Sequence, residues 1–259
     1  CNIALMRQAQ SVKKGVRANG GTPREFCTIT VTDGIAMGHE GMKSSLISRE
    51  VIADSAELTV RGHCYDALVG IAGCDKSLPA LMMAMVRLNV PSVFIYGGSI
   101  LPGRYKGKDV TVVDVFEAVG KHSSGQMSAK ELRALELVAC PSAGACGGQF
   151  TANTMACVSE AIGLALPYSA GTPAPYEERD KYAKESGKTV MNLLAKGIKP
   201  RDIVTRKALE NAATIVAATG GSTNAALHLP AIANEAGIKF DLMDVAKIFK
   251  RTPYLADLK

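Results

Sequence analysis

Residues 67–96 read ALVGIAGCDKSLPALMMAMVRLNVPSVFIY, with a short apolar run at each end and a longer apolar segment between them. Residues 67–72 and 92–96 have the length of buried strands, and residues 78–88 are long enough to form a helix. A strand, a helix and a second strand in this order are typical of the βαβ unit of a parallel sheet. The expected fold class is therefore α/β, with a parallel or mixed sheet flanked by helices.

The segments before this unit fit the same fold class. Apolar residues at helical spacing predict a helix over residues 5–16. Residues 26–31 read as a buried strand that runs into the Gly-rich loop 32–38, and another helix is expected over residues 48–61.

The second half of the chain is expected to be mainly helical. Ser128 and Glu131 have the spacing of a capping box, which predicts a helix that ends near Cys140. Further helices are expected over residues 151–164, 177–196, 201–218 and 223–236, and from Asp241 toward Lys259. We interpret residues 1–259 as one α/β domain with a weak internal boundary near Pro173.

Composition excludes several classes of protein. The chain has 259 residues, of which 47% are hydrophobic and 21% charged, as in an ordinary globular protein. No apolar run approaches the roughly 20 residues that span a bilayer, so no membrane partner is expected. The net charge of +6 is spread thinly and no nucleic-acid motif accompanies it, so no nucleic-acid partner is expected. Seven scattered cysteines favour a reducing compartment over a disulfide framework.

The segment Gly73-Cys74-Asp75-Lys76 joins the first strand of the βαβ unit to its helix. A thiol at a helix start faces unpaired backbone N–H groups and the positive end of the helix dipole, and both favour the thiolate that binds metals. Asp75 offers a hard oxygen ligand. Lys76 is unexpected, because a cation at a helix start meets the unfavourable end of the dipole. The alternative interpretation is a buried cysteine beside a surface Asp/Lys pair.

Other residues suit a ligand site less specifically. Cys140 and Cys146 flank small residues that let the backbone approach a bulky inorganic group, although two buried thiols would show the same spacing. Cys1 precedes the first helix, whose dipole would favour its thiolate. Asp33 follows a predicted strand, as Cys74 does, and ligands of parallel sheets gather at strand ends; an Asp-Gly pair is more often a simple turn.

Two further features allow more than one interpretation. Residues 220–224 form a helix start that suits a carboxylate or phosphate, and it would serve equally as an ordinary cap. The histidines show no metal-ligand spacing, and we interpret each as a structural or surface residue: His39, His63, His122 and His228.

Two stretches carry a resemblance to a known family. Residues 74–80, CDKSLPA, and residues 140–155, CPSAGACGGQFTANTM, resemble signatures of the dihydroxy-acid and phosphogluconate dehydratases. Shorter stretches agree as well: GGTP at 20–23, DGI at 33–35, SRE at 48–50, YGG at 96–98 and GGSTN at 220–224. The similarity covers essentially all 259 residues, and within the family it is greatest to the enzymes of branched-chain amino-acid synthesis.

The resemblance implies two metal sites. An iron–sulfur cluster, with two irons favoured and four as the alternative, would be bound by Cys1, Cys74 and Cys146. A magnesium ion would be bound by Asp33, Asp75 and Lys76. Lys76 would be carbamylated, which would give the ion an anionic oxygen ligand and remove the unfavourable cation from the helix start.

The implied reaction is the dehydration of a 2,3-dihydroxy carboxylic acid to a 2-keto acid, as in valine and isoleucine synthesis. Both metals would act as Lewis acids, iron on the C3 hydroxyl and magnesium on the carboxylate and the C2 oxygen. The family's β-rich C-terminal domain, with the serine proposed as base, would lie beyond Lys259. We therefore expect no catalytic base in this chain and no activity from the chain alone. A homodimer is implied, in the cytoplasm of a bacterium or in an organelle of a eukaryote.

Two alternatives stay open from the sequence. A sugar-acid dehydratase would use the same metals on an aldonate or on 6-phosphogluconate, but a phosphate calls for Arg or Lys near residues 220–224, and none is close in sequence. A non-catalytic iron–sulfur sensor or assembly module needs no magnesium site, and Asp75 and Lys76 argue against it.

Overall fold

The computed structural model describes residues 1–256 and 258. Strands β1 (Leu68–Ala72) and β2 (Ser92–Tyr96) pair in parallel and are joined by helix α4 (Ser77–Leu88), so the predicted βαβ unit is confirmed. The register places Leu68 opposite Ser92 and Ala72 opposite Tyr96. Ten of the twelve residues of α4 are buried, because this helix lies at the centre of the molecule.

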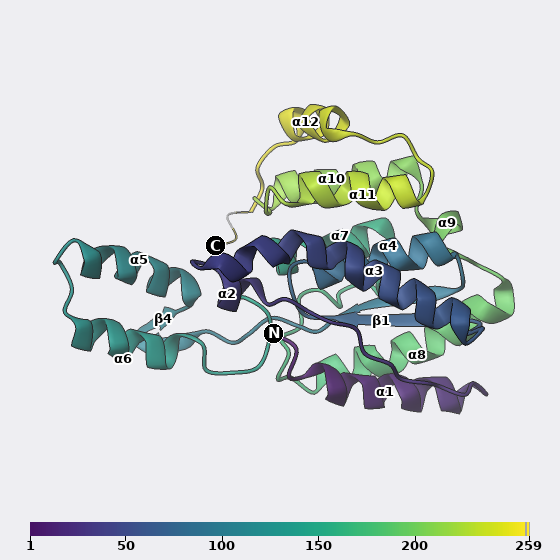
Figure 1. Cartoon of the computed structure of the whole chain (residues 1–259), viewed down its shortest axis with the longest axis horizontal. Helices are drawn as coiled ribbons and strands as arrows, with labels where there is room; N and C mark the ends of the chain where they lie inside the picture. Colours follow the sequence, from purple (N-terminus) through teal and green to yellow (C-terminus); the bar gives the residue numbers. More distant parts are fainter. Residues whose placement is uncertain (257, 259) are drawn as a thin grey trace.

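The two faces of this small sheet are covered by different helices (Figure 1). Successive side chains of a strand point to opposite faces, so each strand contributes to two cores. The larger core contains Leu68, Phe94 and Tyr96 and is built with helices α3 (Ser45–Gly62), α4, α7 (Thr151–Ile162), α10 (Arg206–Ala218), α11 (Ala225–Glu235) and α12 (Leu242–Arg251). The smaller core contains Val93 and Ile95 and is built with α1 (Leu5–Ala18) and α8 (Glu178–Lys196).

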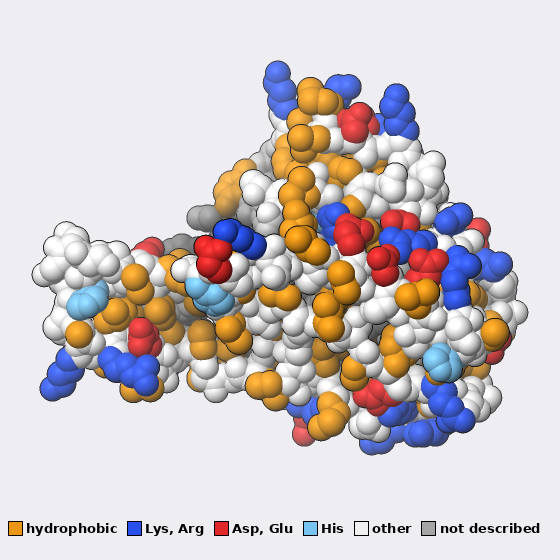
Figure 2. Space-filling model, in the orientation of Figure 1, with side chains coloured by type: hydrophobic (Ala, Val, Ile, Leu, Met, Phe, Trp, Pro, Cys, Tyr) orange, Lys and Arg blue, Asp and Glu red, His pale blue; other side chains and the backbone are white. Residues whose placement is uncertain are grey.

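Arg87 links the helices of the larger layer. Its guanidinium donates to Asp54 Oδ1 at 2.7 Å and Glu57 Oε2 at 3.1 Å on α3, and to Glu235 Oε1 at 2.8 Å on α11. Figure 2 shows acidic and basic side chains gathered over this part of the molecule. The three carboxylates raise the pKa of Arg87, with Glu235 contributing most.

An outer lobe, residues 103–139, extends away from these layers (Figure 1). It contains the antiparallel hairpin of β3 (Gly103–Tyr105) and β4 (Lys108–Val110), followed by α5 (Val112–Ser123) and α6 (Ala129–Ala139). The capping box of Ser128 and Glu131 begins α6, as predicted. The sequence analysis predicted no helix or strand for the residues that form the hairpin and α5. The lobe has a small core of its own.

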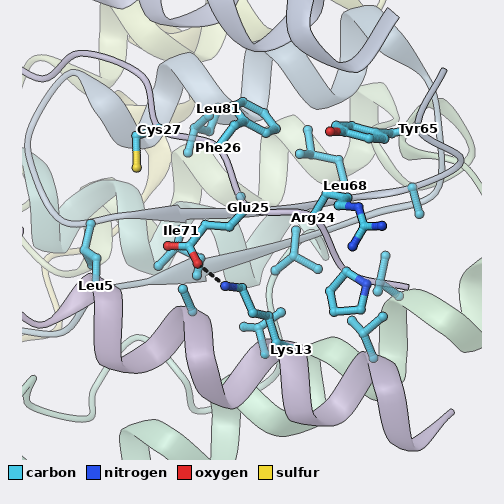
Figure 3. Close-up of a pocket in the computed structure, with 18 of the residues that line it drawn as sticks. Leu5, Lys13, Arg24, Glu25, Phe26, Cys27, Tyr65, Leu68, Ile71 and Leu81 are labelled. Atoms are coloured by element: carbon cyan, nitrogen blue, oxygen red, sulfur yellow. Dashed lines mark ion pairs between the residues drawn. The ribbon is translucent and has the colours of Figure 1, made fainter. Parts of the chain in front are cut away.

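The predicted strand over residues 26–31 is wrong. This segment belongs to no strand, and within the described part of the chain β1 pairs with β2 alone. A cavity of about 820 Å³ separates residues 24–30 from β1 and α1, and an ion pair between Lys13 and Glu25 crosses it (Figure 3). Apolar content favours a strand, but the strand forms only where the backbone finds a partner, and this one does not.

Most other helices lie close to their predicted positions, with differences at the ends. The helix predicted over 201–218 is divided into α9 (Pro200–Ile203) and α10, because the Thr205 hydroxyl accepts from Ala208 N at 3.2 Å and begins a new helix. The last helix, α12, ends at Arg251 rather than near Lys259. The internal boundary near Pro173 falls between α7 and α8 and stays a prediction. No helix among the described residues combines the length and apolar character needed to cross a membrane.

Candidate functional site

A buried group of charges lies where β1 ends and α4 begins. Lys76, only 6% exposed, donates from Nζ to Asp33 Oδ2 at 2.7 Å and to Asp75 Oδ1 at 2.8 Å. Asp33 is also buried and comes from the short helix α2 (Asp33–Ala36), distant in sequence. The Asp33 carboxylate is fixed on its other oxygen, Oδ1, by the Ser45 hydroxyl at 2.7 Å.

The two carboxylates determine the charge of Lys76. Burial alone would lower the pKa of the Lys76 amine, but its hydrogen bonds to Asp33 and Asp75 raise that pKa above its usual value. The amine is therefore an ammonium that balances the buried carboxylate of Asp33 and the partly buried carboxylate of Asp75. The positive charge of Lys76 thus lies between carboxylate oxygens of Asp33 and Asp75, which are hard ligands.

Three helix starts converge on this group of charges. Asp75 and Lys76 precede α4; burial raises the pKa of Asp75, and the Thr151 hydroxyl at the start of α7 is among the nearby groups that lower it. Thr151 Oγ1 in turn accepts from Asn224 Nδ2 at 2.8 Å and lies 3.0 Å from Ser222 Oγ, both just before α11. Because helix starts carry partial positive charge and free N–H groups, the site favours an anionic ligand.

His228 lies against the same group, one helical turn after Asn224. It is completely buried, with Nε2 4.0 Å from Asp75 Oδ1 and Nδ1 3.2 Å from Arg49 Nη1. Burial, followed by the charges of Arg49 and Lys76, lowers the pKa of His228 to about 3, so the imidazole is neutral.

Three cysteines lie near the end of β1: Cys74 follows the strand, Cys146 is influenced by the charges of Cys74 and Asp75, and the Cys1 backbone packs against Gly73. Cys74 is buried, and Cys1 and Cys146 are partly exposed. Burial, followed by the nearby Cys74 and Asp75, raises the pKa of Cys146 to about 11. A side chain at Gly73 would lie 2.6 Å from the Cys1 carbonyl oxygen, so this glycine lets the Cys1 segment pack against the strand end. Cys140, by contrast, is exposed.

The expectation that the helix start favours a Cys74 thiolate is wrong for the protein without a metal. The backbone N–H groups of Asp33 and Asp75 act to lower the pKa of the Cys74 thiol, and for Asp75, beside the helix start, this was expected. Burial outweighs them and raises the pKa of Cys74, and the two nearby carboxylates add to the effect. A metal ion reverses this balance, because coordination deprotonates a thiol.

A pocket of about 200 Å³ opens beside these charges. Its lining residues are Met42, Ser45, Leu46, Lys76, Asn224, Leu227 and His228. Within residues 1–256 and 258, no three His, Cys, Asp or Glu side chains converge tightly enough to hold one metal ion. Lys76 stands between the two carboxylates instead, so a metal site here needs Lys76 to change from a cation to a ligand. The site therefore offers hard oxygen ligands, from Asp33 and Asp75, next to the soft sulfur ligand of Cys74.

Comparison with known proteins identifies the family. All of residues 1–259 match the family described as dihydroxy-acid/6-phosphogluconate dehydratase, N-terminal. The chain belongs to this family. It is 94% identical to a dihydroxy-acid dehydratase of Pelagibacter ubique and 82% identical to one of Parvibaculum lavamentivorans, each over the whole chain and 45% of the relative. A dihydroxy-acid dehydratase of Sulfurisphaera tokodaii is 56% identical over the whole chain and 46% of its own length. The chain thus spans less than half the length of these curated relatives.

The structure brings together the three residues that the resemblance to this dehydratase family implied for the magnesium ion, and their role as ligands stays a prediction. Lys76 is in direct contact with both Asp33 and Asp75, and Asp75 and Lys76 are not the surface pair of the alternative interpretation. Asp33 reaches the site from the start of α2 and not from a strand end, so the reason given for its position was wrong. The helix start at residues 220–224 also joins the site, through Ser222 and Asn224.

Sequence reasoning missed three residues of the site. His228 was interpreted as structural or surface, yet it lies beside Asp75. Arg49 stood in a stretch that resembled the family but received no role, and Ser45 was not singled out. Only His228 had a usable signal: it follows Asn224 by four residues on a helix, which places both side chains on one face.

Proposed function

We propose that this chain is the N-terminal part of a hydro-lyase that converts a 2,3-dihydroxy carboxylic acid into a 2-keto acid in valine and isoleucine synthesis. The observation that carries the proposal is the buried Asp33–Lys76–Asp75 group beside the Cys74 thiol, in a chain 94% identical to a relative named dihydroxy-acid dehydratase. A plain structural domain has little reason to bury three charges and a thiol at one strand end.

The proposed cofactors are an iron–sulfur cluster bound by Cys1, Cys74 and Cys146, and a magnesium ion bound by Asp33, Asp75 and Lys76. Two irons are favoured, with four as the alternative. The donor chemistry fits both groups, since thiolates suit iron and carboxylate oxygens suit magnesium. The buried ammonium of Lys76 already lies between the two carboxylates, where a cation is stabilised. When bound, these metals supply Lewis-acid activation of the substrate's oxygen atoms.

Lys76 becomes a ligand in this proposal by reacting with carbon dioxide. The lone pair of its neutral amine attacks the carbon of CO₂ and forms an N–C bond, while one C=O electron pair moves onto oxygen. The nitrogen loses one proton to solvent, and the product is an anionic carbamate. An anion at the start of α4 is favoured by the helix dipole, whereas the ammonium is not.

The chain's own residues would bind and orient the acid. Thr151, Ser222 and Asn224 present hydroxyl and amide groups at two helix starts, where a carboxylate is stabilised. The 200 Å³ pocket beside Asn224 is also lined by the apolar Met42, Leu46 and Leu227. These side chains would suit the short branched carbon chain of the substrate. The resemblance places the base, a serine, beyond Lys259, and we assign no base within this chain. A homodimer and a cytoplasmic location stay predictions from the resemblance.

The main alternative is a sugar-acid dehydratase, since the family name includes 6-phosphogluconate. Among the residues that line the 200 Å³ pocket, Lys76 is the one cation, and Asp33 and Asp75 already bind it. A phosphate would therefore find no free positive side chain there, which favours an unphosphorylated substrate with apolar carbons.

Turnover by the full-length protein tests the substrate. Anaerobically purified protein is assayed with 2,3-dihydroxyisovalerate, gluconate, arabinonate and 6-phosphogluconate, and the branched dihydroxy acid should be dehydrated with the highest kcat/KM. Faster turnover of any sugar acid would overturn the proposal. Iron, acid-labile sulfide and zinc are measured on the same sample. Zinc without sulfide would refute the cluster and would favour a different class of metalloprotein.

A lysine substitution tests the magnesium site separately. Lys76→Arg keeps a positive charge but cannot form the carbamate, so Mg²⁺-dependent activity should be lost while the iron and sulfide content stays that of the parent. Lys43→Arg is the matched control, because Lys43 is 79% exposed and pairs only with Glu40 in the described structure. Parental activity in Lys76→Arg would exclude the carbamate.

A further inference from the structure

The imidazole of His228 poses a problem that the proposed cofactors do not solve. The side chain is completely buried, and its Nε2 has no hydrogen-bond partner within the described part of the chain. Buried polar atoms almost always have a partner, because an unsatisfied one costs about 1–3 kcal/mol. The residues around His228 explain why a buried nitrogen without a hydrogen-bond partner is kept at this position.

Arg49 fixes which nitrogen of His228 carries the proton. Nδ1 lies 3.2 Å from Arg49 Nη1, and a guanidinium nitrogen only donates. Nδ1 must therefore accept, so the single proton of the neutral ring is on Nε2. Arg49 is itself held by Glu50, whose Oε1 accepts from Arg49 Nε at 3.0 Å. The orphaned atom is thus an N–H donor with a fixed direction.

That donor faces the carboxylate of Asp75. His228 Nε2 is 4.0 Å from Asp75 Oδ1, too far for a hydrogen bond. The same oxygen accepts from Lys76 Nζ at 2.8 Å. One nitrogen donor therefore binds this carboxylate oxygen, and a second nitrogen lies 4.0 Å from it.

We infer that His228 is a positioning residue for Asp75, which it holds by donating from Nε2 to Oδ1 once Lys76 no longer does so. The inference rests on the proposed function, in which the ammonium of Lys76 becomes a carbamate. That change removes the Lys76 donor from Asp75 Oδ1 and leaves this oxygen able to accept another hydrogen bond. The Nε2–H of His228, 4.0 Å away, can then donate to it after a small movement.

A direct contact between His228 and a substrate is a poorer account. Nε2 is shielded from solvent, so a substrate in the 200 Å³ pocket meets other atoms of the ring. Ligand carboxylates in metal sites are commonly held by a hydrogen bond from an outer residue, and loss of that bond weakens metal binding about 10- to 100-fold.

The experiment measures Mn²⁺ binding by electron paramagnetic resonance in the full-length protein, anaerobic, cluster-loaded and supplied with bicarbonate. His228→Leu removes the donor and keeps an apolar side chain of similar size, and it should raise the Mn²⁺ dissociation constant about 10- to 100-fold. His228→Gln offers an amide donor and should restore most of the affinity. His122→Leu, an exposed histidine on α5, is the control and should bind as the parent does. At saturating Mg²⁺ the kcat of His228→Gln should approach that of the parent.

Parental Mn²⁺ affinity in His228→Leu would overturn the inference. If the parent protein itself binds no stoichiometric Mn²⁺, both the proposed magnesium site and the role of His228 are refuted. Parental affinity in His228→Leu, by contrast, would refute only the role of His228. If His228→Leu does not fold, Arg49→Met decides, because it keeps the ring and removes only the group that fixes its tautomer. Its Mn²⁺ affinity should fall, and unchanged affinity would refute the role.

The tautomer of the His228 ring is measured in a separate experiment. In protein labelled with ¹⁵N-histidine, the two-bond nitrogen–proton spectrum should show His228 with a bare Nδ1 and a protonated Nε2 in the parent. Arg49→Met should lose this pattern, and the exposed His122 should not change. A protonated Nδ1 in the parent would contradict the assignment, whatever the metal does.

Discussion

Lys76 determines what the site can hold. Its ammonium occupies the position between Asp33 and Asp75 that a divalent cation would take, so the cation and the ammonium exclude each other. The sequence alone indicated that Lys76 is unusual, because a lysine at a helix start is poorly placed unless it is modified or paired. Which partners it has was not predictable from spacing, since Asp33 lies 43 residues away.

Carbon dioxide and magnesium should therefore bind cooperatively. The carbamate needs a neutral Lys76 amine, and a divalent cation on Asp33 and Asp75 removes the hydrogen bonds that keep it charged. Raising bicarbonate should lower the Mg²⁺ dissociation constant of the full-length protein by about fivefold or more, and Mg²⁺ should raise ¹⁴CO₂ retention by the same factor. Titration calorimetry at two bicarbonate concentrations measures the first effect. Bicarbonate-independent Mg²⁺ affinity would argue against the carbamate.

Arg179 is a second buried cation, and its role is structural. Its guanidinium donates to the backbone oxygens of Tyr96 at 2.8 Å and Ser169 at 2.6 Å, and also to that of Thr172. Burial lowers the pKa of Arg179 to about 10, which leaves it charged at neutral pH. Arg179→Met should cost about 3 kcal/mol or more, because buried carbonyls lose their donors.

The measurement for Arg179→Met is denaturant unfolding of the full-length protein. Arg104→Met is the control, since Arg104 is 69% exposed and pairs only with Asp109 in the described structure, and it should change stability little. Equal stabilities of the two variants would show that the carbonyl contacts of Arg179 contribute nothing. The sequence did not single out Arg179, because nothing in its neighbours distinguishes it from a surface arginine on an amphipathic helix.

Predictions of helices and strands were reliable where they depended on local sequence, and unreliable where they depended on tertiary contacts. The capping box at Ser128 predicted the start of α6, since both of its hydrogen bonds form within one turn. The segment 26–31 was predicted to be a strand from its apolar content, yet pairing depends on the distance to β1, which no local pattern encodes. Helix α5 was missed, although Thr111 and Asp114 form a second capping box of the same kind.

Helices α1 and α8 cross so closely that two glycines are needed. A side chain at Gly15 would lie 2.0 Å from the Lys184 carbonyl oxygen, and one at Gly187 would lie 2.3 Å from that of Val12. Gly187→Ala should therefore force the helices apart and destabilise the protein by about 1–3 kcal/mol. Gly120→Ala, in α5, meets no atom within 4 Å and should stabilise it by about 0.5–1 kcal/mol.

Opposite signs for the two glycine substitutions are the discriminating result. Both add one methyl group to a helical glycine, so their helix propensities change equally. Denaturant unfolding of both variants, read by circular dichroism, gives the difference directly. A stabilised Gly187→Ala would mean that α1 and α8 lie further apart than the structure places them.

For the molecule as a whole, the division into a body and an outer lobe follows from where apolar side chains are buried. Eight of the twelve residues of α7 are buried, whereas Ala118 is the one buried residue that α5 contributes. The sequence did not predict this division, because no helix or strand was predicted where the hairpin and α5 lie. It did predict the α/β class, since that depends only on the central βαβ unit.

The lobe is joined to the body beside a proposed cluster ligand. Ile100 N donates to the Ala145 carbonyl oxygen at 2.9 Å, and Ala145 N donates to that of Gly98 at 2.9 Å. These bonds join the two connections of the lobe immediately before Cys146. Opening of the lobe and release of Cys146 from a cluster should therefore affect each other.

Hydrogen exchange of the full-length protein tests both statements. Amides of α5 and α6 should exchange at least about tenfold faster than those of α7, because opening the lobe exposes less apolar surface. Removal of the cluster by anaerobic chelation should speed exchange further in residues 98–101 and 142–148, since that segment loses its anchor. Helix α10, far from these connections in sequence, should not respond. Equal protection of α5 and α7 would contradict the division, and an unchanged 142–148 segment would argue against Cys146 as a cluster ligand.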